Sequence, residues 1–87
     1  MSVSLLKAPA LRERIGFKTA YIYRLVRNGL LMPPVKVGAR AVAWPSDEVD
    51  RWVMARVRGA SDCEMRQLVT DLVAARTNAG TAADAHS

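Results

Sequence analysis

Residues 16–24 read GFKTAYIYR, and residues 28–44 follow as NGLLMPPVKVGARAVAW. The first stretch is typical of the junction of a helix-turn-helix. The second is typical of a short β-hairpin with an arginine near its tip. Together with the flanking residues, these stretches predict a small α+β fold: a winged helix-turn-helix of three helices and a two-stranded β-hairpin wing, followed by an extra C-terminal amphipathic helix.

Two helices are expected on either side of Gly16. Pro9 suits the first turn of a helix, and Gly16 suits its end because glycine adopts the left-handed conformation at little cost. After a turn over residues 17–19, a second helix is expected over residues 20–28, closed by Gly29. The apolar side of this helix is expected to pack against the first helix and the turn, through Ile22, Leu25 and Val26 on one side and Leu11, Ile15 and Phe17 on the other.

The opposite side of the second helix is basic. Ala20, Tyr23, Arg24 and Arg27 share it at i, i+3, i+4 and i+7, and Lys18 and Thr19 stand at its N-terminal end. Such a face fits the major groove of DNA, where arginine binds guanine edges and tyrosine reaches a phosphate. An ordinary solvated helix face is the alternative. The hairpin that follows in the sequence favours the DNA-binding interpretation of this face.

The hairpin is predicted because large apolar residues alternate with Lys36 and with Ala43 on the two sides of a tight turn over residues 38–40. Two strands this short are not stable alone, so they are expected to lean on the helices. Lys36 and Arg40 then stay exposed, and Arg40 can enter a minor groove. The alternative is that Arg40 only makes the turn soluble and does not contact DNA. The residues expected to face the helices are Val35, Val37, Val42 and Trp44.

A third helix is expected to begin with Ser46 as its N-cap. The acidic residues that follow, Asp47, Glu48 and Asp50, are explained by the helix dipole, and no metal site is expected there. The side expected to face the core carries Val49, Trp52, Val53 and the stem of Arg56.

Beyond Gly59, Ser61 and Glu64 have the spacing of a capping box, and a helix is expected over residues 61–76. It could fold back on the winged domain (residues 5–58) or join a second copy of the chain. Residues 78–87 are small and polar, so we expect a disordered tail. The apolar stripe that is the candidate for oligomerisation consists of Met65, Leu68, Val69, Leu72 and Val73.

Composition narrows the function. The chain has 87 residues, enough for one domain, and residues 1–60 carry eleven Lys or Arg against four Asp or Glu. A charge of +7 there against −2 in residues 61–87 indicates a polyanionic partner for the first part. One cysteine, no signal peptide and no long apolar run predict a soluble cytosolic protein. The only histidine, His86, lies at the frayed end, so an enzyme is the least expected class and no cofactor is expected.

The ordered motifs between residues 5 and 57 resemble the AlpA-like and phage excisionase family, small MerR-like winged-helix proteins of phages and integrated elements. The resemblance is carried by residues 16–17 (GF), 22–25 (IYRL), 28–29 (NG), 33–38 (PPVKVG), 41–44 (AVAW) and 46–52 (SDEVDRW). It implies that the second helix reads the major groove through Thr19, Ala20, Tyr21, Tyr23, Arg24 and Arg27, and that Lys36 and Arg40 on the wing grip the backbone and minor groove.

The chain departs from the family at the start of the second helix. Family members usually carry a small hydroxyl residue where Lys18 stands, so we expect Thr19 to cap the helix instead. Ala20 and Tyr21 stand where the family often has Ser and Thr. Tyr21 could stack on DNA or reach a sugar, so an unusual sequence preference is expected.

The resemblance implies two roles on double-stranded DNA. An excisionase binds tandem sites cooperatively, bends DNA and steers an integrase (a tyrosine recombinase) towards excision. An AlpA-like regulator binds near promoters and changes transcription. We favour the excisionase slightly, because one small module has a small footprint and gains affinity from neighbours on DNA. A protein-interaction module without DNA binding is a third hypothesis, which the basic charge disfavours.

Overall fold

The computed structural model describes residues 3–84, and the side chains of residues 3–76. It confirms the predicted α+β class, a winged helix-turn-helix with an additional C-terminal helix. The elements in chain order are β1 (Leu5–Leu6), α1 (Ala8–Ile15), α2 (Thr19–Arg27), β2 (Val35–Lys36), β3 (Val42–Pro45), α3 (Ser46–Val57) and α4 (Asp62–Asp84).

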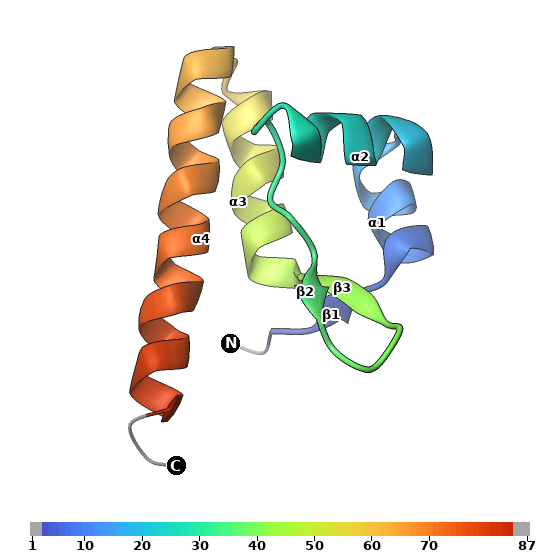
Figure 1. The fold of residues 1–87 in the computed structure, drawn as a ribbon. Coiled ribbons are helices and arrows are strands. Elements are labelled where there is room, and N and C mark those ends of the chain that lie inside the picture. The colour runs from blue at the N-terminus through green and yellow to red at the C-terminus, as the bar shows by residue number, and fades with distance from the viewer. Residues whose placement is uncertain (1–2, 85–87) are drawn as a thin grey trace.

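α3 lies in the middle of the molecule (Figure 1). α1 and α2 lie on one side of it, α4 runs antiparallel along the other side, and the loop between β2 and β3 projects away from the helices (Figure 1). The strands form an antiparallel sheet in the order β1-β3-β2. The wing therefore lies on the same side of α3 as the helix-turn-helix.

The two glycines that end α1 and α2 behave as expected. Gly16 caps α1 with a φ of 77°, and Gly29 follows α2 with a φ of 75°. α2, however, begins at Thr19, one residue earlier than predicted, and Lys18 is its N-cap. The carbonyl of Lys18 accepts a hydrogen bond from the amide of Ile22 at 3.0 Å, so the first helical turn is already closed at that point. The expectation that Thr19 caps the helix is therefore wrong.

Trp44 is the largest of the fully buried side chains of the core. Leu11 of α1 and Ile22 and Leu25 of α2 are also buried, as the helical periodicity predicts. Ile15, Phe17 and Val26 are partly buried and pack against the same cluster, which α3 completes through Val49, Trp52 and Ala55.

The sheet has one strand more than predicted, because β1 pairs with β3 with Leu5 opposite Pro45 and Leu6 opposite Trp44. Ser46 takes part in this N-terminal pairing. Its hydroxyl oxygen accepts a hydrogen bond from the amide of Ser4 at 2.9 Å, and its own amide donates to the carbonyl of Ser4 at 2.8 Å. Ser46 is consequently the first residue of α3, after Pro45 as N-cap, and the N-cap predicted for Ser46 is wrong.

The wing is less buried than predicted. Val35 is partly buried and Trp44 is fully buried, but Val37 and Val42 are both exposed. The reason is the register: Val42 pairs with Lys36 at the outer end of the ladder, so Val37 already belongs to the projecting loop. Ala43, which lies on the middle strand, is buried in their place.

α4 packs against the same domain. Met65, Val69 and Leu72 are buried in the common core, and Leu68 and Val73 pack against it partly buried. The structure thus has the first of the two predicted arrangements, in which the helix folds back. The stripe predicted for oligomerisation is occupied within the chain, so pairing with a second copy through it would require α4 to leave the core.

The capping box predicted at the start of α4 is confirmed, but the helix extends further than predicted. The capping box forms: the amide of Ser61 donates to Glu64 Oε1 at 2.9 Å, and the amide of Glu64 donates to Ser61 Oγ at 3.2 Å. The helix then continues to Asp84 instead of ending near Arg76. Residues 78–84, which were predicted to be disordered, belong to this helix, and three of the seven are alanine, the strongest helix former. The rest of the predicted tail, residues 85–87, lies outside the described residues.

The acidic start of α3 does more than interact with the helix dipole. Glu48 is buried, and its carboxylate accepts two hydrogen bonds from the guanidinium of Arg76 on α4. The Nε–Oε2 distance is 2.8 Å. This pair fastens the middle of α4 to the beginning of α3, and the sequence analysis did not identify it.

Candidate nucleic-acid interface

The outward face of α2 presents Ala20, Arg24 and Arg27 to solvent, as the helical spacing predicts. All three are exposed, and Lys18 is exposed at the beginning of the helix. Within residues 3–76, neither arginine forms an ion pair. Their charge is therefore available to an external anion.

Acidic residues are absent from the part of the sequence that forms this face and the wing. Residues 16–46 contain two lysines and three arginines and no Asp or Glu. The three ion pairs of the described residues are all formed between side chains of α1, α3 and α4, and they join Arg14 to Asp50, Arg56 to Asp62 and Arg76 to Glu48. Carboxylates thus neutralise arginines elsewhere in the fold, while the positive charge of α2 and the wing stays concentrated.

The two tyrosines of α2 flank the outward face. The ring of Tyr21 lies edge-on to Phe17 with a centroid distance of 4.8 Å, and the ring of Tyr23 lies 6.1 Å from that of Trp44. Tyr21 therefore extends the face towards the turn after α1, and Tyr23 connects it to the wing. Both rings remain partly accessible for contact with a partner.

The wing carries the two remaining cations predicted for the interface. Lys36 and Arg40 are exposed, and the loop between them is closed by a hydrogen bond from the amide of Val37 to the carbonyl of Ala41 at 2.9 Å. α2 and this loop lie on the side of α3 that faces away from α4 (Figure 1). A helix and a thin basic loop on one side of a domain can contact a major groove and an adjacent minor groove.

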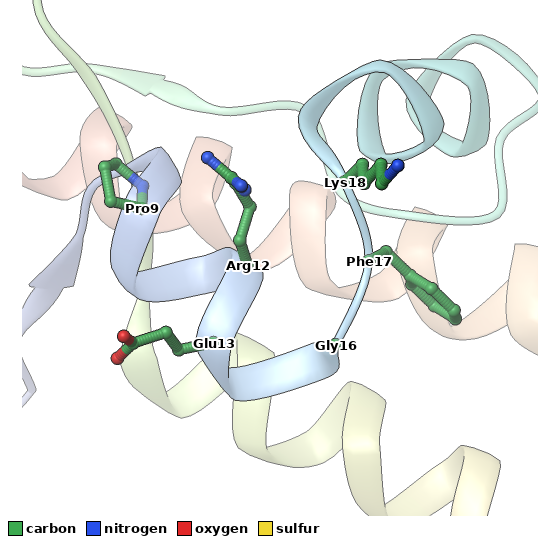
Figure 2. Close-up of a pocket in the computed structure, with 6 residues that line it drawn as sticks. All are labelled: Pro9, Arg12, Glu13, Gly16, Phe17 and Lys18. Carbon is green, nitrogen blue, oxygen red and sulfur yellow. The ribbon is translucent and has the colours of Figure 1, made fainter.

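Two shallow depressions line the N-terminal end of α2. The first, of about 390 Å³, lies at the turn between α1 and α2, where Arg12 comes from α1 and Lys18 from the turn (Figure 2). The second, of about 240 Å³, is formed by Lys18, Ala20, Tyr21 and Arg24. Arg12 was not among the predicted residues. It lies on α1 beside Glu13, so the first depression, unlike the second, is lined by side chains of both charges.

The connection between α2 and the wing is held by side-chain hydrogen bonds to alternate backbone carbonyls. Arg66 Nε donates to the carbonyl of Asn28 at 3.0 Å, Trp52 Nε1 to that of Leu30 at 2.7 Å and Trp44 Nε1 to that of Met32 at 2.8 Å. The three donors come from α4, α3 and β3. They fix the path of the connection, and hence the position of the wing relative to α2.

The rest of the surface offers little chemistry. The described part of the chain holds no group of three or more His, Cys, Asp or Glu side chains placed to share a metal ion. His86 lies outside the described residues. Within residues 3–84, no helix combines the length and the apolar character needed to cross a membrane.

Comparison with known proteins identifies the family of the chain and a curated relative. Residues 4–57 match the family model described as the prophage CP4-57 regulatory protein (AlpA). The chain is also 35% identical, over 54 residues, to the uncharacterized protein ORF88 of Enterobacteria phage P4. This match covers 62% of the chain and 61% of that relative's length. No solved structure matches. The matched family region ends at the end of α3, and α4 lies beyond it.

Proposed function

Because the chain belongs to the family of the prophage CP4-57 regulatory protein AlpA, we propose that it is a regulator that binds double-stranded DNA in a sequence-specific manner. The observation that carries the proposal is the five-cation, acid-free stretch of residues 16–46, which folds into α2 and the wing on one side of the domain. A surface of this charge and shape fits a DNA duplex better than a protein partner or a small substrate.

α2 is the element that we place in the major groove. Arg24 and Arg27 are exposed, form no ion pair with the side chains of residues 3–76, and lie on the face opposite the buried Ile22 and Leu25. Arginine donates two parallel hydrogen bonds to a guanine edge, whereas contacts to phosphate fix only orientation. We assign base choice mainly to Arg24, at the middle of the face, and phosphate contact mainly to Arg27. Thr19, Ala20 and Tyr21 complete the face at its N-terminal end.

The wing supplies the second contact. Lys36 lies at the base of the loop and Arg40 near its tip, and both are exposed. Lys36 adds phosphate affinity that depends on salt, and Arg40 enters the minor groove, where narrow A·T tracts concentrate negative potential. A single module of this size buries about 600–1,000 Å² on DNA, so neighbouring copies or a second protein raise its affinity.

Two biological roles use this interface. The family description, a regulatory protein, favours control of transcription from a promoter. The word prophage in that description favours the excisionase role, because an integrated element must leave the chromosome. Cooperative binding by an excisionase needs contacts between copies, and the stripe of α4, the candidate surface for such contacts, is used inside the fold. We therefore propose the transcriptional regulator first, and an excisionase that bends DNA and directs an integrase second.

A gel-shift titration with circularly permuted fragments of the integration locus and of its promoters separates the roles. We expect one complex confined to a promoter if the protein regulates transcription. Stepwise complexes whose mobility depends on the position of the site indicate tandem binding and bending, and would transfer the conclusion to the excisionase.

The DNA proposal itself is tested by charge reversal. Arg24→Glu with Arg40→Glu places two acidic groups on the interface without touching the core, because both side chains are exposed. Binding to all DNA should be lost while the far-UV circular dichroism spectrum stays that of the wild type. Unchanged DNA binding would show that α2 and the wing are not the DNA-binding surface, and a wild type that binds no DNA would favour a protein-interaction module.

A further inference from the structure

α4 lies outside the region that matches the family, yet it contacts the end of the helix that we place on DNA. Arg66, one turn into α4, donates from Nε to the carbonyl of Asn28 at 3.0 Å. A Cβ added to Gly29 would lie 3.8 Å from Cγ of Arg66, so the stem of the arginine also covers the backbone of the turn. The contact thus combines a directional hydrogen bond with packing.

The carbonyl that Arg66 binds belongs to a helix end that needs partners. The last carbonyls of an α-helix have no amide inside the helix to bind. At the end of α2, the amides of Asn28, Gly29 and Leu30 satisfy the carbonyls of Arg24, Val26 and Leu25. The carbonyl of Asn28 points out of the helix end and accepts from Arg66 instead. A cation at this place is also favoured by the helix dipole.

α4 is anchored to the core, so it can fix the position of the C-terminal end of α2. Met65, adjacent to Arg66, has no exposed surface, and Arg76 further along is bound to the buried Glu48 of α3. Arg66 therefore projects from a helix fixed at two points. Of the three side chains that hold the connection between α2 and the wing, it is the only one outside the matched region, since Trp44 and Trp52 lie within it.

We propose that Arg66 is a positioning residue for DNA binding, through which α4 fixes the C-terminal end of α2 relative to the wing. The inference rests on the proposed function. A major-groove helix and a minor-groove loop must keep a fixed separation to contact adjacent grooves together, and a shift of the helix end misplaces both. The loss of Arg66 should consequently reduce binding to the cognate site more than binding to random DNA.

A different use of Arg66 makes the opposite prediction. Its side chain is exposed, and its charge lies next to the end of α2, so the competing hypothesis is a direct contact between the guanidinium and a DNA phosphate. A phosphate contact strengthens cognate and random DNA alike and adds about one unit to the salt dependence. Positioning does neither.

Arg66→Gln separates the two, because the glutamine Nε2 stands the same number of bonds from the backbone as the arginine Nε. The variant keeps the stem that covers Gly29 and a donor for the carbonyl of Asn28, but it loses the charge. Arg66→Ala removes the stem, donor and charge. Arg51→Gln is the matched control, since Arg51 is an exposed arginine on α3 with no ion pair within residues 3–76.

The experiment measures the affinity of the full chain for a cognate and a random duplex over a range of salt. We expect Arg66→Ala to bind the cognate site roughly five- to tenfold more weakly, the scale of the net contribution of one ordinary hydrogen bond, with little change on random DNA. Arg66→Gln should recover most of the loss, with the salt dependence of the Arg51→Gln control. An equal loss on both duplexes that glutamine does not recover, or no loss in either Arg66 variant, overturns the inference.

Hydrogen exchange gives a readout that does not depend on DNA. The amides of Gly29 and Leu30, bonded to the carbonyls of Val26 and Leu25, should exchange faster in Arg66→Ala than in Arg66→Gln or the wild type. If the wild type binds no DNA, the proposed function fails, and these exchange rates alone decide whether Arg66 holds the end of α2. Equal exchange rates in the wild type and both variants would show that Arg66 does not stabilise the end of α2.

Discussion

The ring of Tyr23 on α2 lies 6.1 Å from the ring of Trp44 on β3, with the two planes inclined by 58°. Trp44 is fully buried and its indole N–H donates to the carbonyl of Met32, so its orientation is fixed. Tyr23, in contrast, is 38% exposed and packs against this fixed ring on its solvent side. The helix and the wing that we place in adjacent grooves therefore meet directly through one aromatic contact.

Replacing Tyr23 tests this contact. Tyr23→Ala should lower the free energy of unfolding by about 1 kcal/mol, the scale of one aromatic pair, and should weaken DNA binding several-fold. Tyr23→Phe keeps the ring and should resemble the wild type in both. Urea unfolding and a DNA titration check the pair. A phenylalanine variant that binds DNA as poorly as the alanine variant would show that the hydroxyl, and not the ring, is what matters.

The pair of Glu48 and Arg76 predicts a large effect on stability. Arg76→Ala leaves the carboxylate of Glu48 buried without its two hydrogen bonds, and the loss should be about 2–4 kcal/mol, because Arg76 is itself partly exposed. Arg14→Ala removes an ion pair of similar chemistry at the surface, with Asp50, and should cost less than about 1 kcal/mol. Equal losses in urea unfolding would show that the Glu48 pair contributes no more than a surface pair.

Leu72 tests whether α4 belongs to the core. Leu72→Asp places a charge at a position that is 4% exposed, and the chain should lose about 3–5 kcal/mol of stability, a large part of what a small domain has. Ala74→Asp, at an exposed position of the same helix, is the control and should fold normally. A Leu72→Asp protein that is stable but binds DNA without cooperativity would instead assign the stripe to contacts between copies.

Several features of this fold could be predicted from the sequence alone. Local signals are reliable when the physics is local: Gly16 and Gly29 end helices because they adopt a positive φ, and Ser61 and Glu64 cap α4 through bonds three residues apart. The basic face of α2 follows from helical spacing alone. These features need no knowledge of the rest of the chain.

The features that escaped prediction depend on distant partners. β1 has two residues and no alternation, and it exists because β3 offers it an edge. Glu48 has the same signature as a residue that interacts with the helix dipole, and only the packing of α4 brings Arg76 to it. Arg66 looks like a solvated helix residue until the end of α2 is placed beside it. Tertiary contacts decide all three.

Glu64 gives a prediction on pH. Its carboxylate accepts hydrogen bonds from the backbone amide and, second, from the hydroxyl of Ser61, and these lower its pKa in the folded chain. A lowered folded pKa stabilises the fold above the unfolded pKa, and the stabilisation is lost as the pH falls through the folded value. The wild type should therefore lose more stability between about pH 7 and about pH 3 than Glu64→Gln does. Urea unfolding across this range measures the difference, and parallel curves would contradict it.

The division of labour on DNA is tested with Arg24 and Lys36. Both are exposed and unpaired among the described residues, so alanine at either position should leave the fold intact. Arg24→Ala should relax sequence preference, with a loss of about 1–3 kcal/mol on the cognate site and little on random DNA. Lys36→Ala should weaken all duplexes alike and reduce the salt dependence by about one unit.

The two variants control for each other, because each removes one positive charge from the same side of the domain. Long-range attraction to DNA therefore falls equally in both, and any difference between them reports the local contact. A cognate-to-random affinity ratio that drops only in Arg24→Ala places base readout on α2 and leaves the wing a sequence-independent anchor. If the ratio drops only in Lys36→Ala, the wing reads the sequence, and α2 serves for orientation on the backbone.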